Sequence, residues 1–431
     1  MPVYTDPVVK ETVVRHRLRS GLEVAVIPRK GQRRTYATFT AHYGSIDNRF
    51  RLPDTGEVLE VPDGIAHFLE HKMFEQPGGD VFDDFARLGA SANAYTEYLT
   101  TTYLFSTTAH VDECLEILLN FVQEPYFTEQ NVEKEKGIIE QEIRMYLDMP
   151  GDRLHSNLMR ALYQRHPVRL DIAGSVESIR TITPEILYRC YETFYHPSNM
   201  LLLVIGDVDP AHVIDRVTAN QAPKNFQPQG PIPRLMPQEP PAVAERRVER
   251  RMAVALPLLA VGYKDPVHEL VGPDLLRREL VTGLMWQMLL GKSSPLFASL
   301  YEAGLINDRF QARYTAAPTF AHSVLAGETP DPEALFGRLA EELPRAALTP
   351  DALERAKRRE RGEYVGLFDN PGELAYVYNS LYFRQIDLFA VLDVLERVTL
   401  ADIEERRAEH VREELRATSI VWPEDAPGSS A

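Results

Sequence analysis

The first hundred residues alternate apolar and polar positions in a way that predicts paired strands around a short helix. Segments 21–29 and 35–45 alternate like strands and are separated by turn residues at 30–32. Segment 64–74 reads as a helix, whereas 91–108 is rich in the β-branched and aromatic residues that favour strands. The chain therefore begins as a mixture of strands and helices.

Amphipathic helices are predicted at 110–122, 128–146 and 184–195, and Thr128 and Thr183 stand where the last two would be capped. The longest continuous apolar run, at 200–206, predicts a buried strand and is too short for the roughly 20 residues of a membrane span. Strand pairs interleaved with helices predict an α+β fold. In it, mixed or antiparallel sheets carry helices on one face.

A proline-dense segment without apolar periodicity, 221–243, predicts a linker at the midpoint of the chain. It separates an N-terminal domain, 1–220, from a C-terminal domain, 244–431. Both halves have the size of an ordinary domain.

The two halves resemble diverged copies of one unit. TEQNVEKEK, from Thr128, matches TPDALERAK, from Thr349, in register at a distance of 221 residues. ITPEILYRCYETF, from Ile182, precedes the strand at 200–206, and VTLADIEERRAEH, from Val398, precedes ATSIVWPED at an offset close to 216. Two matches in the same order indicate an internal duplication.

Composition and charge exclude several classes of function. The net charge of −16 argues against a nucleic-acid binder, which would show a basic face. The two cysteines, Cys114 and Cys190, form no Cys-x-x-Cys pair, so neither a thiolate zinc site nor a disulfide framework is expected. The first residues lack the layout of a signal peptide. We therefore expect a cytoplasmic protein with no membrane association.

The segment DGIAHFLEHKMF carries the candidate chemistry. His67 and His71 are four residues apart and project from the same side of a helix, with Glu70 beside them. Two imidazoles at this spacing can share one Zn²⁺, and a neighbouring carboxylate can hold and deprotonate the metal-bound water. H-x-x-E-H is the inverzincin signature. On its own, the spacing also fits two histidines on a protein surface.

A third zinc ligand is sought on the helix predicted at 128–146. Glu142 lies among the apolar residues of that helix, with Glu135 seven residues earlier on the same line, whereas Glu140 points away. The predicted apolar face is marked by Ile138, Ile139, Met145 and Tyr146. A carboxylate on an apolar face is costly unless it is paired or binds a metal. Glu142 is therefore the predicted ligand and Glu135 a partner that orients an imidazole. The alternative is a pair of salt-bridged glutamates.

The sequence resembles the pitrilysin-type inverzincin peptidases. Among them, it resembles the half-length subfamily that includes bacterial and mitochondrial processing peptidases. The resemblance spans nearly the whole chain in order and spacing, through GIAHFLEHKMFE, GASANAYTEYLTTTYLFST, VEKEKGIIEQEIRMYLDMP, HPVRLDIAGSVESI and YHPSNMLLLVIGDVD.

The resemblance implies roles for individual residues. It makes His67, His71 and Glu142 the zinc ligands, Glu70 the general base and Glu135 an outer-shell partner. Ala92, Asn93 and Ala94 match an edge strand that binds substrate by main-chain hydrogen bonds. It also implies that the two halves form half of a clamshell and that two such chains enclose a chamber.

The second half departs from the first and from the family pattern. Its histidines, His268, His322 and His410, form no H-x-x-E-H, so the C-terminal domain is expected to lack a metal site. Active family members carry an Arg and a Tyr seven residues apart to stabilise the oxyanion. In the matching segment, 299–310, Tyr301 stands at the Arg position and Asn307 or Asp308 at the Tyr position, while Arg309, Arg313 and Tyr314 lie off the pattern.

The prediction is a metalloendopeptidase with one Zn²⁺ per chain, acting on peptides or unfolded polypeptides in a closed chamber. We expect it to be the catalytic subunit of a heterodimer whose metal-free homologous partner supplies the Arg and Tyr; a homodimer is the other possibility. One alternative function is a non-catalytic structural or assembly subunit of the same fold. Another is a metal-binding protein without hydrolysis, which would have no need of Glu70.

Overall fold

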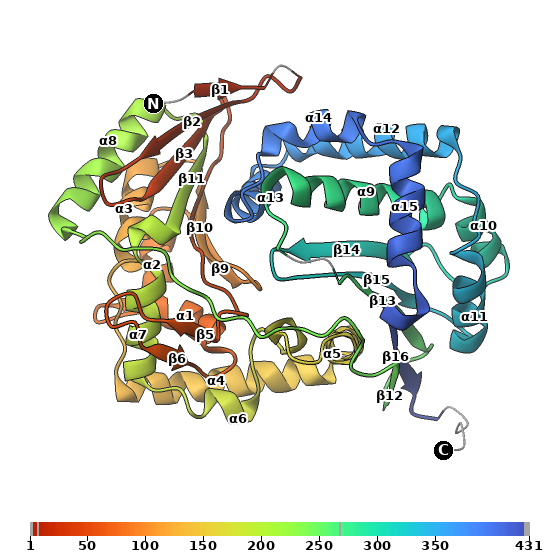
Figure 1. The fold of residues 1–431 in the computed structure, drawn as a ribbon. Coiled ribbons are helices and arrows are strands. Elements are labelled where there is room, and N and C mark those ends of the chain that lie inside the picture. Colours follow the sequence, from red (N-terminus) through yellow and green to blue (C-terminus); the bar gives the residue numbers. More distant parts are fainter. Residues whose placement is uncertain (1–2, 7, 267–268, 426–431) are drawn as a thin grey trace. The chain divides into compact units, whose positions relative to one another are not determined.

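The computed structural model describes residues 3–6, 8–266 and 269–425, which form two compact units (Figure 1). Unit 1 comprises Met1–Ile143, Asp171–Leu235 and Val365–Phe383. Unit 2 comprises Arg144–Leu170, Met236–Tyr364 and Arg384–Ala431. No helix among the described residues is both long and apolar enough to cross a bilayer.

Unit 1 is built on a seven-stranded sheet in the order β1-β2-β3-β11-β4-β10-β9. Only the β3–β11 pair is parallel, so the sheet is mixed as predicted. The last strand, β9, pairs with β10 and with no other described strand, which makes it an edge. The strands of this sheet are β1 (Val3–Thr5), β2 (Thr12–Arg17), β3 (Glu23–Pro28), β4 (Thr35–Ala41), β9 (Ser91–Thr96), β10 (Thr101–Thr107) and β11 (Met200–Gly206).

Helices and two small hairpins complete unit 1. The helices are α1 (Ile65–Met73), α2 (Val81–Arg87), α3 (Val111–Phe121), α4 (Glu129–Asp148, which continues into unit 2), α6 (Val176–Ile179), α7 (Pro184–Phe194), α8 (Pro210–Gln221) and α13 (Pro371–Phe383), with the short 3-10 helices η2 (Pro197–Asn199) and η3 (Ala222–Lys224). The hairpins are β5 (Arg49–Arg51) with β6 (Val58–Glu60), and β7 (Glu75–Gln76) with β8 (Gly79–Asp80).

Alternation along β4 explains how helices cover this sheet. Ala37 and Phe39 belong to the main hydrophobic core, together with residues of α1, α3 and α7. Thr38 lies on the opposite face of the strand, where its hydroxyl accepts a hydrogen bond from Asn379 of α13 at 3.0 Å. The main helical layer therefore covers one face, and α13 covers part of the other (Figure 1).

Unit 2 repeats this plan with a five-stranded sheet in the order β12-β16-β13-β15-β14. Its strands are β12 (Arg247–Met252), β13 (Leu258–Lys264), β14 (Gln311–Ala317), β15 (Phe320–Glu328) and β16 (Arg416–Pro423). Its helices are α5 (Pro150–Leu162), α9 (Gly272–Leu290), α10 (Pro295–Glu302), α11 (Pro332–Glu342), α12 (Pro350–Leu367, which ends in unit 1), α14 (Val391–Glu396) and α15 (Leu400–His410), with η1 (Pro167–Arg169), η4 (Leu388–Ala390) and η5 (Glu413–Leu415).

The predicted duplication is confirmed by sheet topology. The series β3-β11-β4-β10-β9 in unit 1 corresponds strand for strand to β12-β16-β13-β15-β14 in unit 2. Both series have one parallel pair at the same place, β3–β11 and β12–β16, and antiparallel pairs elsewhere. Two related α+β units with mixed sheets therefore make up the chain.

The two compact units differ from the two halves of the sequence on either side of the proline-rich segment. Helix α5 precedes that segment in sequence but packs on β13 and β16, so it belongs to unit 2. Helix α13 follows it by more than a hundred residues but packs on β4 and β11 in unit 1. Helix α5, from the first half of the sequence, therefore belongs to unit 2, and helix α13, from the second half, belongs to unit 1. A single division of the sequence cannot describe this exchange.

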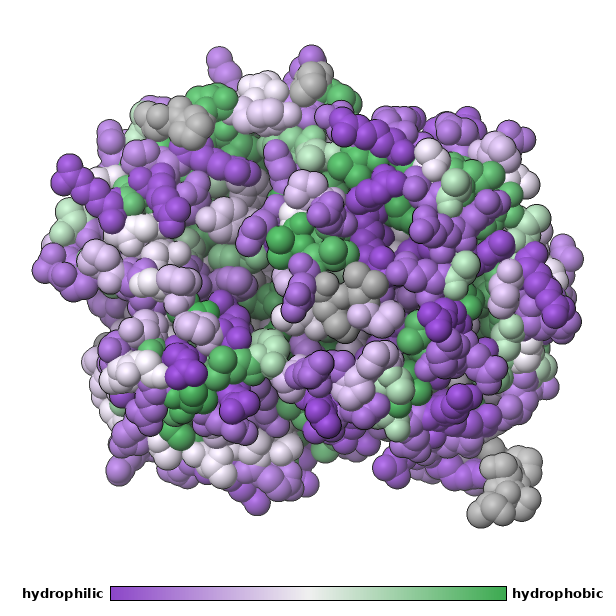
Figure 2. All heavy atoms as spheres, viewed as in Figure 1, coloured by the Kyte–Doolittle hydropathy of each residue, from purple (hydrophilic) through white to green (hydrophobic). Residues whose placement is uncertain are grey.

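The predicted linker itself forms neither helix nor strand between Asn225 and Arg246, apart from one bridge between Phe50 and Arg234. Its later part is anchored in unit 2 by the fully buried Lys264. That ammonium donates to Glu239 Oε1 at 2.5 Å and to two carbonyl oxygens, of Pro240 and Ala242. The face seen in Figure 2 is mostly hydrophilic, with hydrophobic side chains in small groups.

Candidate metal centre

Helix α1 begins at a position that strongly favours glycine. Gly64 has a φ of 88°, and a β-carbon there would lie 2.3 Å from the carbonyl oxygen of Ala173. The helix that follows buries Phe68 and Leu69 completely. Because these apolar residues fix the rotation of the helix, His67 and His71 are held on the side that faces α4.

Three side chains converge at a spacing that suits one metal ion. Glu142 Oε1 lies 3.7 Å from His67 Nε2, and Glu142 Oε2 lies 3.5 Å from His71 Nε2. Around a tetrahedral zinc with bonds near 2.0–2.1 Å, neighbouring ligand atoms stand about 3.4 Å apart. Among the described residues, His67, His71 and Glu142 form the one group of this kind, with ligand atoms within 4.8 Å of one another. The donor set therefore fits zinc.

A second layer of residues orients His71. Its Nδ1 lies 3.0 Å from Glu135 Oε1, and a proton on Nδ1 would leave the Nε2 lone pair facing Glu142. Lys72 is fully buried beneath this pair. Its ammonium donates to Glu75 Oε2 at 2.5 Å and lies 3.7 Å from Glu135 Oε2. No sequence pattern singles out Lys72, which looks like an ordinary surface lysine.

The electrostatics of the two histidines differ. Burial, followed by the neighbouring His71, lowers the pKa of His67 to about 3, so this imidazole is neutral at physiological pH. Burial also opposes protonation of His71, but the hydrogen bond to Glu135 and the charge of Glu70 outweigh it and raise its pKa. Burial would raise the pKa of Glu135, but the same hydrogen bond lowers it.

Glu70 lies beside the triad but is not part of it. Its side chain is buried, and its carboxylate Oε2 accepts a hydrogen bond from Thr96 Oγ1 at 2.6 Å. Burial raises the pKa of Glu70, and the Thr96 bond opposes that rise. Sequence reasoning missed Thr96, because nothing in a strand pattern says which helix residue a threonine will meet.

The edge strand β9 adjoins the same region. A pocket of about 640 Å³ is lined by Glu70, His71, Glu135, Asn93 and Ala94, among others. Asn93 is exposed and Ala94 is half-buried. Ala92 is also half-buried on β9 but does not line the pocket. The structure thus brings two of the three predicted substrate-binding residues to the predicted base.

The structure brings Glu142 to the histidines, but the helix face predicted to be buried around it is partly exposed. Ile138 and Met145, taken to mark a buried apolar face, are 46% and 48% exposed. The buried residues of α4 are Asn131, Val132, Glu135, Ile139 and Ile143. Glu142 lies at the margin of this stripe. Apolar residues on two adjoining faces of the helix blurred the periodicity on which the prediction rested.

The corresponding helix of unit 2 has other residues at the positions of His67, Glu70 and His71. When α9 is aligned with α1 at Gly272, a positive-φ glycine like Gly64, Leu275, Arg278 and Glu279 stand where His67, Glu70 and His71 stand. The second half of the sequence contains three histidines. His322 pairs with Tyr163 and His410 with Ser323, whereas His268 lies outside the described residues.

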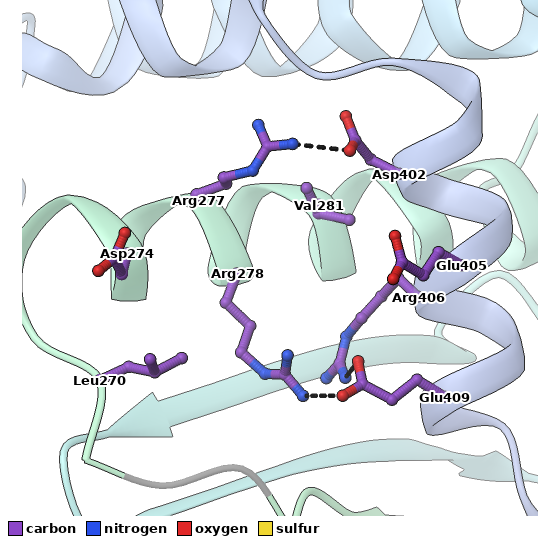
Figure 3. Close-up of a pocket in the computed structure, with 9 residues that line it drawn as sticks. All are labelled: Leu270, Asp274, Arg277, Arg278, Val281, Asp402, Glu405, Arg406 and Glu409. Carbon is purple, nitrogen blue, oxygen red and sulfur yellow. Dashed lines mark hydrogen bonds and ion pairs between the residues drawn. The ribbon is translucent and has the colours of Figure 1, made fainter.

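An ion-pair network centred on the fully buried Asp265 lies beside α9 in unit 2. Asp265 accepts two hydrogen bonds from Arg278, one from Arg406 and one from Tyr314. Figure 3 shows Arg278 and Arg406 converging beside Glu409 between α9 and α15, in a pocket of about 470 Å³. Since the cations in the centre of this pocket already have carboxylate partners, the pocket offers no ready binding site for an anion.

The arginine and tyrosine that active family members use to stabilise the oxyanion have no counterpart in the segment 299–310. Tyr301 lies on α10 with 53% of its surface exposed. Asn307 donates to Glu328 at 2.9 Å. Farther along, Tyr314 donates to Asp265. No arginine and tyrosine stand seven residues apart in this segment.

Comparisons with known proteins identify the family to which this chain is related. Residues 54–176 match the family described as insulinase (peptidase family M16), and residues 181–360 match the peptidase M16 inactive domain. The uncharacterized zinc protease YmfH of Bacillus subtilis is 44% identical over 97% of this chain and 98% of its own length. The zinc protease PqqE of Helicobacter pylori is 24% identical over 87% of this chain and 84% of its own.

Solved structures show the same fold. An M16-like peptidase structure from Alicyclobacillus acidocaldarius superposes with a TM-score of 0.92 at 39% identity, covering 98% of this chain and 99% of the other. Pitrilysin superposes with a TM-score of 0.72 at 13% identity, and this chain covers 46% of it. The latter likeness concerns the fold alone.

Proposed function

Because this chain belongs to the M16 peptidase family, we propose that it is a zinc-dependent endopeptidase acting on peptides or unfolded polypeptides in a closed chamber. The observation that carries the proposal is the meeting of His67, His71 and Glu142 at ligand spacing with Glu70 alongside. A structural metal site would have no need of a buried carboxylate beside the ligands. A hydrolytic one needs a base there.

Each residue has a distinct role in this proposal. His67, His71 and Glu142 hold one zinc ion, and Glu135 keeps the His71 ring in the required tautomer. Bound zinc supplies Lewis acidity and lowers the pKa of water. Glu70 takes a proton from the attacking water and later returns it to the leaving amine. Asn93 and Ala94 on β9 hold an extended substrate by main-chain pairing at the sheet edge, with Ala92 continuing that edge.

The test compares the wild type with Glu70→Gln on a library of quenched-fluorescent peptides. Glutamine keeps the shape of the side chain but cannot accept a proton, so hydrolysis should fall by at least about 100-fold, the contribution typical of general-base catalysis. Zinc content should stay unchanged, because Glu70 is not among the ligands. Equal hydrolysis by both proteins would refute the peptidase proposal.

We further propose that the chain works with a homologous metal-free subunit that supplies the Arg and Tyr. Support comes from the segment 299–310, where Tyr301 and Asn307 stand at the positions those residues would occupy. The chain is assayed alone and after co-expression with a homologue lacking H-x-x-E-H from the same genome. Full activity of the purified chain alone, as a homodimer, would contradict the heterodimer.

The family also contains members that do not hydrolyse peptides, and part of this chain matches a domain called inactive. A structural or assembly role is therefore the second candidate. The complete H-x-x-E-H motif and its buried base favour the peptidase. The cytoplasmic location stays a prediction from the sequence.

A further inference from the structure

Strand β9 and helix α1 are joined by one hydrogen bond at the candidate centre. Thr96 is the last residue of β9, and its hydroxyl donates to Glu70 Oε2 at 2.6 Å. Glu70 is 8% exposed, so water competes little for this carboxylate oxygen. A short bond from a neutral donor to a buried carboxylate is among the stronger hydrogen bonds in proteins.

The Thr96 hydroxyl is the donor in this bond. The neighbouring Thr101 Oγ1 donates to the carbonyl oxygen of Tyr43 at 2.9 Å, and it lies 3.4 Å from Thr96 Oγ1. A hydroxyl has one proton. Since the Thr101 proton is used by the Tyr43 carbonyl, Thr101 does not donate to Thr96. The Thr96 proton goes to the Glu70 carboxylate, which accepts hydrogen bonds and lies nearer, at 2.6 Å, than the Thr101 hydroxyl at 3.4 Å.

The pleat of β9 explains why this hydroxyl reaches the helix. Ala92, Ala94 and Thr96 alternate along the strand and share one face. Both alanines pack against the core of unit 1, and α1 packs against β9. Thr96 is therefore the polar residue on a face that is otherwise lined by methyl groups, at the point where the strand passes Glu70.

We propose that Thr96 is a positioning residue that ties the base to the substrate-binding strand. Held through Oε2, the Glu70 carboxylate cannot rotate freely, and its other oxygen is presented to the attacking water. Because the tie comes from β9, a peptide that pairs with this edge is placed in a fixed relation to the base. This inference rests on the peptidase function proposed above.

The test uses three variants of the zinc-loaded protein, with its partner if one is required, on a quenched-fluorescent peptide that the wild type cleaves. Thr96→Val removes the hydroxyl at constant shape and should lower kcat about 10- to 100-fold, with KM and zinc content within about twofold. Thr96→Ser keeps the hydroxyl and should recover activity to within about threefold. Thr102→Val is the matched control, because it removes a buried hydroxyl that pairs with Thr40 on the adjoining strands.

Outcomes separate the two proposals. If Thr96→Val keeps the wild-type kcat while Glu70→Gln is inactive, Thr96 does not position the base and the peptidase stands. A positioning role is equally excluded if Thr96→Ser fails as badly as Thr96→Val, or if Thr102→Val lowers kcat equally, since either would indicate a general effect on packing. If the wild type shows no Glu70-dependent hydrolysis, both proposals fall.

Discussion

Glu135 offers the sharpest test of how the protein tunes its candidate metal centre. It is 7% exposed, and its two carboxylate oxygens face different partners. Oε1 lies 3.0 Å from His71 Nδ1, and Oε2 lies 3.7 Å from Lys72 Nζ. The substitution Glu135→Gln keeps the size of the side chain and an acceptor oxygen but removes the negative charge.

We expect this change to weaken zinc binding about 10- to 100-fold, as is typical when the partner of a ligating imidazole is altered. This corresponds to about 1.4–2.7 kcal/mol. The carboxylate normally makes the His71 ring a better donor and fixes its tautomer, whereas an amide can also present its NH₂ group to Nδ1. Lys72 keeps its 2.5 Å contact with Glu75, so the fold should survive.

The assay is competition for zinc between the protein and a chromophoric chelator, which measures affinity independently of hydrolysis. Glu140→Gln is the matched control. It lies on the same helix and pairs with Arg180 at 3.0 Å, away from the histidines, and should bind zinc like the wild type. A zinc affinity of Glu135→Gln within twofold of the control would show that this carboxylate does not support His71.

Other predictions concern stability and are checked by urea unfolding. Asp265→Asn leaves the buried Arg406 and the half-buried Arg278 without their shared carboxylate and should cost about 3–5 kcal/mol. Glu413→Gln breaks an exposed ion pair and should cost less than about 1 kcal/mol; similar losses for the two variants would refute this reasoning. Burial would raise the pKa of Asp265, but the arginines lower it well below its usual range. The ionised Asp265 therefore stabilises the folded state fully above about pH 4, and this contribution is lost as pH falls toward the folded-state pKa. The gap between wild type and Asp265→Asn should therefore narrow below about pH 4, and a gap that widens there would contradict the sign. Gly64→Ala should lower the free energy of unfolding by at least about 1–3 kcal/mol, because of the positive φ and the nearby Ala173 carbonyl. Gly137→Ala, at an exposed helical site with open space, should raise it by about 0.5–1 kcal/mol. Equal effects of the two substitutions would exclude the close approach at α1.

Local structure could be predicted well from the sequence. The apolar run at 200–206 is the buried strand β11, and the helix expected at 64–74 is α1, at Ile65–Met73. Thr183 caps α7 as predicted. These features depend on residues close in sequence, whose periodicity and capping chemistry are visible without any tertiary contact. The internal repeat could be recognised for a related reason, because both copies retain the same local pattern.

In the candidate site, too, some residues could be predicted from local sequence and others could not. The juxtaposition of His67, Glu70 and His71 follows from one turn of helix, so the sequence by itself determined it. Glu142 is different: periodicity separated it from Glu140, but the face chosen as buried was partly exposed. A helical pattern reports which residues share a face and says nothing about the partner that the face will meet.

Only the tertiary structure decided the contacts between distant segments. Thr96 meets Glu70 across 26 residues, and Lys72 lies beneath Glu135 although it looks like a surface residue in the sequence. Helices α5 and α13 join units that their sequence positions do not indicate. The physical reason is the same in each case. Packing of the sheet and helices selects one arrangement among many with equal local propensity, and the chemistry of the centre depends on the side chains which that arrangement brings into contact.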